Sequence, residues 1–412
     1  MKKHCVVIGA GIVGASCAWY LQRKGLEVTV IDPELPGESC SSGNASCIAT
    51  SGVVPLSCPG IIKKVPGWLF DPLGPVSIRP GDIPALIPWL WKFWRVCNMQ
   101  RLEEIASAEA TLMHSALADW DAILKAVGAS SLKQSPGTIR LYDTEKEYQD
   151  DLWQFELTER LGFEHHRLSR ADLKTMVPAL KLEKGVALMA PDWHHLVDPA
   201  KATARIADDC FRNGGHWIQD RVTVVSAGET GISLETGSGD KLEPDHLVVA
   251  AGAWSNSVAR QLDYEVPLIA ERGYHSQIRK PGVELKHPVM SLSRHFVMTP
   301  LEDGLRVAGT AEFAALDAKP DYRRARVLLE LAGHYLDGLK TDEVTEWMGQ
   351  RPAMPDSLPV ISVSPRHANA FYAFGHGHYG ITQGPTTGRI IADLVTGEKP
   401  QLDISAFRFD RF

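Results

Sequence analysis

The sequence predicts an α/β fold, with a Rossmann-like nucleotide-binding domain assembled from discontinuous segments and an α+β domain that contains an antiparallel sheet. Three observations lead to this expectation. Residues 6–32 read as strand, glycine turn, helix and strand. Strand and glycine-turn signals return at 246–255 and 370–397, far along the chain. Between them, 271–313 carries short strand-like runs typical of an antiparallel meander.

The first unit, VVIGAGIVGASCAWYLQRKGLEVTVID, has the residues that a dinucleotide site needs. Its three glycines (Gly9, Gly11 and Gly14) allow a tight turn, close approach of a pyrophosphate and close packing of helix on strand. The helix that follows begins near Ile12 and Val13 and directs its free N–H groups at the phosphates. Asp32 ends the second strand, where a ribose hydroxyl needs an acceptor.

The composition of the whole chain excludes several classes of protein. A net charge of −7 over 412 residues, without a basic block, disfavours nucleic-acid binding. Seven cysteines with no C-x-x-C pair favour free thiols in a reducing compartment. No apolar run reaches the roughly 18 residues of a membrane-spanning helix, and the apolar run after the basic start already serves as the first strand. We expect a cytoplasmic protein, and we expect no metal site because the histidine pairs lack supporting ligands.

The nucleotide-type signals divide the chain. Segments 1–58, 198–260 and 345–412 are predicted to form the cofactor domain, and 59–197 with 261–344 the substrate-binding domain. Helices are predicted at 101–128, at 144–162, from 169, from 198 and at 321–339. The helix starts rest on cap residues, such as Asp198 followed by Pro199.

Four ordered motifs together resemble the D-amino acid oxidase superfamily of FAD-dependent oxidoreductases. They are the opening glycine motif, VVAAGAWS, GQRPAMPDSLPVI and GHGHYGITQGPTTGRIIADL, and they span essentially the full length. The resemblance is strongest to the D-amino acid dehydrogenase and hydroxyproline dehydrogenase-like branch. It implies FAD as the cofactor, which the first glycine motif alone leaves open.

The resemblance also implies which residues hold FAD. The loop SCSSGNAS would reach the pyrophosphate and flavin, and the C-terminal loop would direct a helix N-terminus at the flavin N1–C2=O edge. An ordinary surface loop and an ordinary glycine-rich turn are the alternatives. Some relatives tether FAD through a cysteine where this chain has Gly349, so we expect non-covalent FAD. The implied cofactor residues outside the first unit are Ser41, Ser42, Gly43, Asn44, Ala45, Val222, Ala251, Gly252, Gly375, Gly377, Tyr379, Gly380, Ile381 and Thr382.

For the substrate, the resemblance points to Arg351, whose guanidinium matches a carboxylate bidentately. A structural ion pair is the alternative role. Tyr274, His275 and His378 are expected to face the pocket, although lone aromatic and histidine residues also serve as core.

The implied reaction is oxidative deamination of a small amino acid, either a D-amino acid or a cyclic, hydroxyproline-type one, by hydride transfer from the α-carbon to flavin N5. Val307 aligns with a lysine of oxygen-using relatives, which favours a dehydrogenase that passes electrons to a quinone or protein acceptor. The alternatives are a sarcosine- or glycine-type secondary-amine oxidase that uses oxygen, and an FAD-bearing electron-transfer subunit of a hetero-oligomer.

A tryptophan-rich segment, 68–94, suggests peripheral contact with the inner face of a membrane. Leu86, Ile87, Leu90, Trp91 and Trp94 are expected on one helical side, with Lys92 and Arg95 nearby. Packing on the substrate domain, or a lid over the active site, is the alternative. The oligomeric state stays open.

Overall fold

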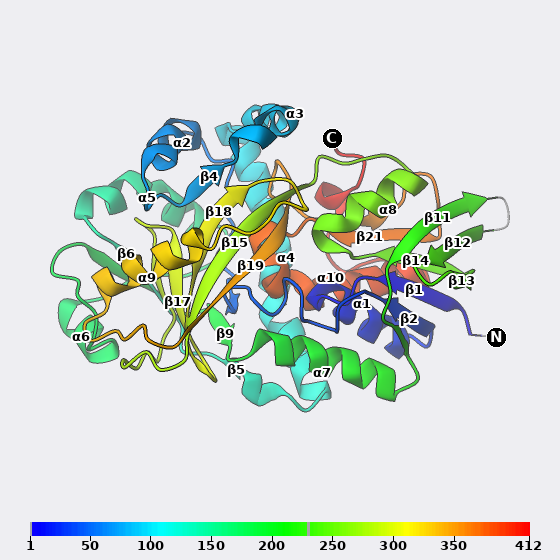
Figure 1. Ribbon diagram of the computed structural model, residues 1–412, viewed down its shortest axis with the longest axis horizontal. Coiled ribbons are helices and arrows are strands. Elements are labelled where there is room, and N and C mark those ends of the chain that lie inside the picture. The colour runs from blue at the N-terminus through cyan, green and yellow to red at the C-terminus, as the bar shows by residue number, and fades with distance from the viewer. Residues whose placement is uncertain (1, 229–230) are drawn as a thin grey trace.

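The computed structural model describes residues 2–228 and 231–412. Two large sheets dominate it (Figure 1). A six-stranded sheet holds both the N-terminal strand and the last strands of the chain, and a nine-stranded sheet lies beside it. The mixed α/β architecture predicted from the sequence is confirmed.

The six-stranded sheet is parallel except for its last strand. All its strands come from the three segments predicted for the cofactor domain. Because the strands β2, β1, β14 and β21 run parallel, their carboxyl ends meet at one edge, where ligands of such sheets bind. Its order is β10 (His216–Ile218), β2 (Glu27–Ile31), β1 (His4–Ile8), β14 (His246–Val249), β21 (Ala370–Phe374) and β20 (Val360–Val363).

Both faces of this sheet are covered, as its unbroken apolar strands require. Alternate residues of β1 enter different core clusters, with Cys5 and Val7 on one face and Val6 and Ile8 on the other. On the first face pack α1 (Ile12–Arg23), α10 (Gly380–Thr396) and, outside them, α4 (Met99–Ala126). The other face carries α8 (Ser255–Leu262) and a small sheet of β11 (Val222–Gly228), β12 (Gly231–Thr236) and β13 (Lys241–Leu242).

The nine-stranded sheet contains the predicted meander, in which β15, β18 and β17 pair antiparallel. Its order is β19 (Val344–Ala353), β15 (Ile269–Ile278), β18 (Gly304–Phe313), β17 (Phe296–Leu301), β16 (Val289–Ser291), β6 (Thr138–Tyr142), β8 (Val186–Ala190) and β7 (His166–Arg167), with β4 (Val76–Ile78) beside β18. The predicted boundary at 345 places β19 with the cofactor segments, whereas β19 pairs with β15. The division into two domains otherwise stays a prediction.

Most predicted helices form close to their expected limits. The Thr144 side chain caps α5 (Glu145–Arg160), Ser169 caps α6 (Arg170–Met176) and Asp198 caps α7 (Pro199–Arg212). α9 (Arg323–Tyr335), which packs on the nine-stranded sheet, is shorter than the predicted 321–339. A second small sheet joins β3 (Cys47–Ile48), β9 (His194–Leu196) and β5 (Lys133–Gln134).

The tryptophan-rich segment forms α3 (Ile83–Val96), which lies near α2 (Ile61–Phe70) at the top of Figure 1. Leu86 was expected on the exposed side of α3, but it is buried with Trp89 and packs toward Ala353. The other four residues expected on that side are exposed: Ile87, Leu90, Trp91 and Trp94. No helix among the described residues is long and apolar enough to cross a membrane.

Candidate active site

A cavity of about 730 Å³ lies between the two large sheets. It extends from the carboxyl ends of β1 and β2 to strands β15, β18 and β19. Most of the predicted cofactor residues line it: Gly9, Gly11, Ile12, Val13, Asp32, Ser41, Gly43, Asn44, Ala45, Val222, Ala251, Gly252, Gly377, Tyr379, Gly380 and Ile381.

The first glycine turn has the geometry that its sequence predicts. Gly9 has a φ of +110°, and a Cβ there would lie 2.4 Å from the carbonyl oxygen of Ala250. A Cβ on Gly14 would lie 1.9 Å from the carbonyl oxygen of Gly9, so Gly14 lets α1 pack against the turn and does not line the cavity. Asp32 accepts hydrogen bonds from the N–H groups of Ala10 at 2.7 Å and Glu34 at 2.9 Å, which fixes its carboxylate at the cavity wall.

The second cofactor loop, SCSSGNAS at 39–46, is held largely by its own side chains. Asn44 donates to the carbonyl oxygen of Ser41 and accepts from the N–H of Ser46, both at 2.7 Å. Arg306 on β18, which the sequence analysis did not single out, donates to the carbonyls of Ser42 and Asn44, each at 2.8 Å. The Ser42 hydroxyl donates to carbonyls of its own loop and does not line the cavity, contrary to expectation.

The C-terminal loop places the N-terminus of α10 at the cavity, with Gly377, Tyr379, Gly380 and Ile381 in its wall. Free N–H groups and the positive end of the helix dipole meet there. Two residues predicted for this site do not line the cavity. Gly375 turns the chain at a φ of +84° outside the cavity lining, and the Thr382 hydroxyl instead accepts the N–H of Ala49 at 3.0 Å.

Arg351 lines the cavity from β19, and one edge of its guanidinium is already engaged. Its Nη1 donates to Glu271 Oε1 at 2.6 Å and to the carbonyl oxygen of Thr310 at 3.1 Å. The guanidinium lies over Gly273, where a Cβ would approach Nη2 to 2.2 Å. No hydrogen bond to the described residues engages Nε or Nη2, so that edge can receive a carboxylate in a bidentate arrangement.

Glu271 was missed by the sequence analysis and holds two site residues together. The same Oε1 lies 3.0 Å from His378 Nε2, and the Glu271 side chain is only 3 % exposed. Burial alone would raise the pKa of this carboxyl, but His378 and Arg351 outweigh burial and lower it to about 2. Glu271 is therefore ionised at neutral pH.

The register of β15 against β19 explains which side chains share this face. The facing pairs are Glu271 with Arg351, Gly273 with Gly349 and His275 with Trp347. The side chain at 274 lies on the other face, since neighbouring residues of a strand point to opposite sides. There the buried Tyr274 hydroxyl donates to Glu312 at 2.6 Å, while Tyr274 also belongs to the lining of the cavity, so its predicted role at the pocket stays a prediction.

His275 lies on the expected face but behind Trp347, and it does not line the cavity. The two rings stack at 5.1 Å, and His275 Nδ1 bonds with the carbonyl oxygen of Gly43 at 2.8 Å. Burial, with a smaller effect of Arg306, lowers the pKa of His275 to about 3. The residue braces the second cofactor loop as a neutral imidazole.

Trp347 also fills the space beside the position where relatives carry a tethering cysteine. A Cβ on Gly349 would lie 1.9 Å from the Trp347 ring, so any larger residue at this position requires the ring to move. Val307 is fully buried in the core under α9, on the face opposite the cavity, whereas the neighbouring Ala308 lines the cavity. Val307 therefore does not face the cavity, although its alignment with a lysine near the flavin implies that it would.

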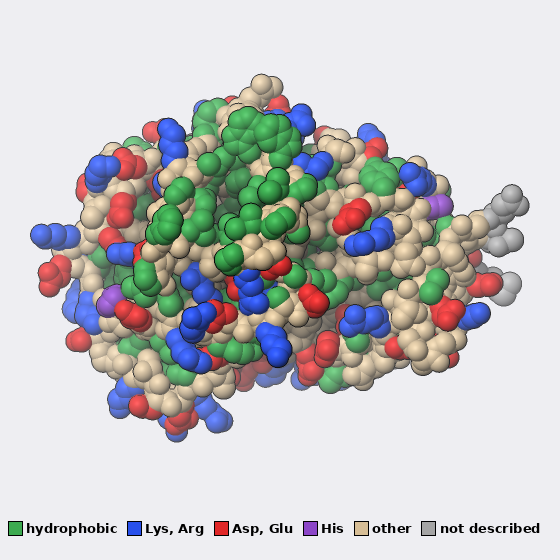
Figure 2. Space-filling view, turned by 45° about the horizontal axis from the view of Figure 1, so that its top comes forward, with side chains coloured by type: hydrophobic (Ala, Val, Ile, Leu, Met, Phe, Trp, Pro, Cys, Tyr) green, Lys and Arg blue, Asp and Glu red, His purple; other side chains and the backbone are tan. Residues whose placement is uncertain are grey.

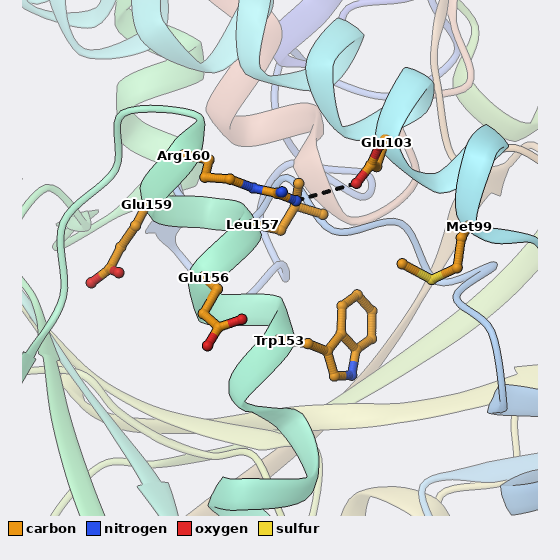
Figure 3. A pocket seen from close by; sticks show the side chains of 7 residues that line it. All are labelled: Met99, Glu103, Trp153, Glu156, Leu157, Glu159 and Arg160. Atoms are coloured by element: carbon orange, nitrogen blue, oxygen red, sulfur yellow. Dashed lines mark hydrogen bonds and ion pairs between the residues drawn. The ribbon is translucent and has the colours of Figure 1, made fainter.

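A second cavity, of about 360 Å³, lies on the surface between α4 and α5 (Figure 3). Glu103 and Arg160 pair across it at 3.2 Å, and none of the predicted site residues lies in it. We assign it no function. Among the described residues, no group of three or more histidine, cysteine or acidic side chains is placed to hold a metal ion.

Residues 4–394 match the family model described as "FAD dependent oxidoreductase", abbreviated DAO. The chain belongs to this family. A D-amino-acid oxidase of Bradyrhizobium diazoefficiens is 32% identical, over 100% of this chain and 99% of the relative. A D-amino acid dehydrogenase of Mesorhizobium japonicum is 28% identical, over 99% of each chain. The crystal structure of glycine oxidase from Geobacillus kaustophilus is similar in fold, with a TM-score of 0.77, 19% identity and complete coverage of both chains.

The cavity fits the FAD that this family uses. It has a glycine turn that a Cβ would fill at one end, the N-terminus of α10 at the other, and the braced loop 39–46 between them. The arginine and carboxylate at β15 and β19 lie beyond the cofactor loops, in the part of the cavity walled by the nine-stranded sheet.

Proposed function

We propose that this DAO-family enzyme oxidises the α-carbon–nitrogen bond of a small amino acid, with D-amino acids or cyclic, hydroxyproline-type acids as the preferred class. The observation that carries the proposal is the free edge of Arg351 at a cavity that fits FAD. A carboxylate held there would place the α-carbon inside the cavity. The relatives named for D-amino acids, which match over the full length, support this substrate class.

The residues have distinct duties in this reaction. Arg351 binds the substrate carboxylate, and Glu271 fixes the guanidinium from its other edge. The glycine turn, the loop 39–46 and the N-terminus of α10 would hold the cofactor, with Gly349 favouring non-covalent attachment. FAD, when bound, would supply the oxidation by accepting a hydride from the substrate. Much of the rate would come from orientation of the substrate by Arg351.

The electron acceptor is the second part of the proposal, and we infer a dehydrogenase that uses a quinone or a protein. Val307 lies in the core and no longer supports a dehydrogenase. The support for a quinone or protein acceptor comes instead from the surface of α2 and α3. Phe70 is 89% exposed, and Trp91 and Trp94, which stack at 5.0 Å, are each more than half exposed. Figure 2 shows hydrophobic side chains gathered over this part of the molecule. Exposed tryptophans with the exposed Arg95 on the same helix suit contact with an anionic membrane surface.

The inner side of the same helices reaches the cavity, because Trp68, Trp89 and Phe93 line it. The outer side of the two helices thus fits the predicted contact with a membrane. Their inner side fits the predicted lid over the active site. We propose a peripheral enzyme at the cytoplasmic side of the membrane. Oxygen use, as in a secondary-amine oxidase, and service as an electron-transfer subunit remain the competing functions.

The test is product chemistry with the purified chain. D- and L-amino acids, D-proline, hydroxyproline isomers and sarcosine are each supplied with an artificial dye, with and without oxygen. The proposal expects dye reduction matched by a 2-oxo acid and ammonia, or by a cyclic imine. Reaction with sarcosine and oxygen alone would favour the oxidase, and a chain inert without a partner subunit would favour the electron-transfer role.

A further inference from the structure

The corner formed by Glu271, Arg351 and His378 contains a group that the proposed reaction needs. An amino acid arrives with its nitrogen as an ammonium, whereas only the neutral amine can supply the lone pair for oxidation. A substrate held by Arg351 carries that ammonium on the carbon next to its carboxylate. The proton must therefore leave close to this corner.

We propose that His378 is the base that takes this proton at Nδ1, and that Glu271 is the residue that positions it. The inference rests on the proposed function. His378 Nε2 lies 3.0 Å from Glu271 Oε1, which makes Nε2–H the donor and leaves the lone pair on Nδ1. His378 lines the cavity, and its side chain is 35% exposed. A buried carboxylate that orients an imidazole and stabilises its protonated form is the arrangement of known acid–base catalysts.

Glu271 itself is poorly suited to be the base. It is fully buried and one of its oxygens is shared by Arg351 and His378, so its pKa of about 2 keeps it ionised. A carboxylate so weakly basic does not hold a proton at neutral pH, but its charge stabilises an imidazolium next to it. The proton would move from the substrate nitrogen to His378 Nδ1 and later to solvent, and no electrons move in this step.

The surroundings of His378 contain few other charges. Its short turn packs against β19, which presents Arg351, and against the start of α10, which presents no charged side chain. Glu271 faces it from β15. On its own segment, His376 bonds with the Thr387 hydroxyl and burial lowers its pKa to about 3, while burial raises the pKa of Tyr379. Glu271 is thus the acidic side chain that bonds His378 among the described residues.

The experiment is flavin reduction in the holoenzyme, followed by stopped flow without oxygen from pH 6 to pH 10. Wild type is expected to reach its plateau rate near neutral pH. His378→Gln must release the proton to solvent, so its rate at pH 7 should fall at least tenfold, recover toward wild type at pH 10, and rise with added imidazole. In Glu271→Gln the rise of the reduction rate with pH should occur at lower pH than in wild type, because a neutral amide stabilises the imidazolium less. His166→Gln, the same exchange at an exposed position, should leave the profile unchanged.

A binding measurement separates catalysis from structure. The FAD absorbance change on adding a carboxylate without an amine should give a Kd within threefold of wild type in His378→Gln. An equal loss of rate at pH 7 and pH 10, or a wild-type pH profile, would overturn the role of His378. If wild type itself is not reduced by any amino acid at any pH, the proposed function fails instead.

Discussion

At the scale of single residues, the alternation of side chains between the two faces of β15 and β19 determines which of them meet at the site. Arg351 could be predicted because its motif is local. Glu271 was missed because its role depends on pairing with a strand about 80 residues away. The period of two in ERGYH could have shown that Glu271, Gly273 and His275 share a face that excludes Tyr274. The burial of His275 behind Trp347 has no signal in the sequence, since it depends on how two rings pack.

Gly273→Ala tests the placement of the guanidinium. The added Cβ would lie 2.2 Å from Arg351 Nη2 and displace the group without removing it. Loss of one charge-assisted contact should weaken binding of a carboxylate by about 1.5–3 kcal/mol. The measurement is the Kd from the flavin absorbance change. Gly333→Ala, a helical position with open space around it, is the control and should bind normally. Equal Kd values in both variants would show that Arg351 does not hold the carboxylate.

At the scale of elements, the helices were the most predictable part, since caps and apolar periodicity are local. The packing of α4 on α10 was not predictable. It places Glu109 of α4 against Gln383 of α10, with a hydrogen bond of 2.6 Å in a fully buried contact. Burial raises the pKa of Glu109 to about 8 from 4.5. The folded chain therefore keeps a proton that the unfolded chain releases.

This contact predicts a pH dependence of stability. Because the folded state binds more protons between pH 4.5 and 8, Glu109 makes stability fall as pH rises through that window. Glu109→Gln keeps the shape and the acceptor for Gln383 but cannot ionise. Thermal unfolding should show a higher Tm than wild type at pH 8 and a smaller difference at pH 5. A difference that does not change with pH would contradict the account.

The exposed residues of α3 predict membrane binding. Wild type should float with anionic vesicles at low salt and dissociate as salt rises, because part of the attraction is electrostatic. The variant Trp91→Ser/Trp94→Ser should stay in the soluble fraction. Trp89 is left unchanged, because it is buried and its replacement would disturb the packing of α3. Wild-type protein that stays with the soluble fraction would remove the membrane proposal and favour a soluble acceptor.

At the scale of the whole molecule, the sequence predicted the two kinds of sheet and the separated cofactor segments. It grouped β19 with the cofactor segments, whereas β19 pairs with β15, a contact between distant parts of the chain that local patterns do not reveal. We predict that FAD binds without a covalent bond, because Gly349 offers no thiol and Trp347 occupies the space beside it. Acid or heat should release intact FAD, measured in the supernatant. Flavin that stays with the precipitated polypeptide would contradict it.

The most direct test of the central claim is anaerobic titration of the yellow holoenzyme with the panel of amino acids, comparing wild type with Arg351→Ala and Arg351→Lys. The account predicts that at least one amino acid bleaches the wild-type flavin. Arg351→Ala should keep FAD but bind that amino acid more weakly by about 2–5 kcal/mol. Arg351→Lys should restore only part of this binding free energy, because an ammonium cannot make the bidentate contact. No bleaching by any amino acid, or unchanged half-saturation in Arg351→Ala, would contradict the account.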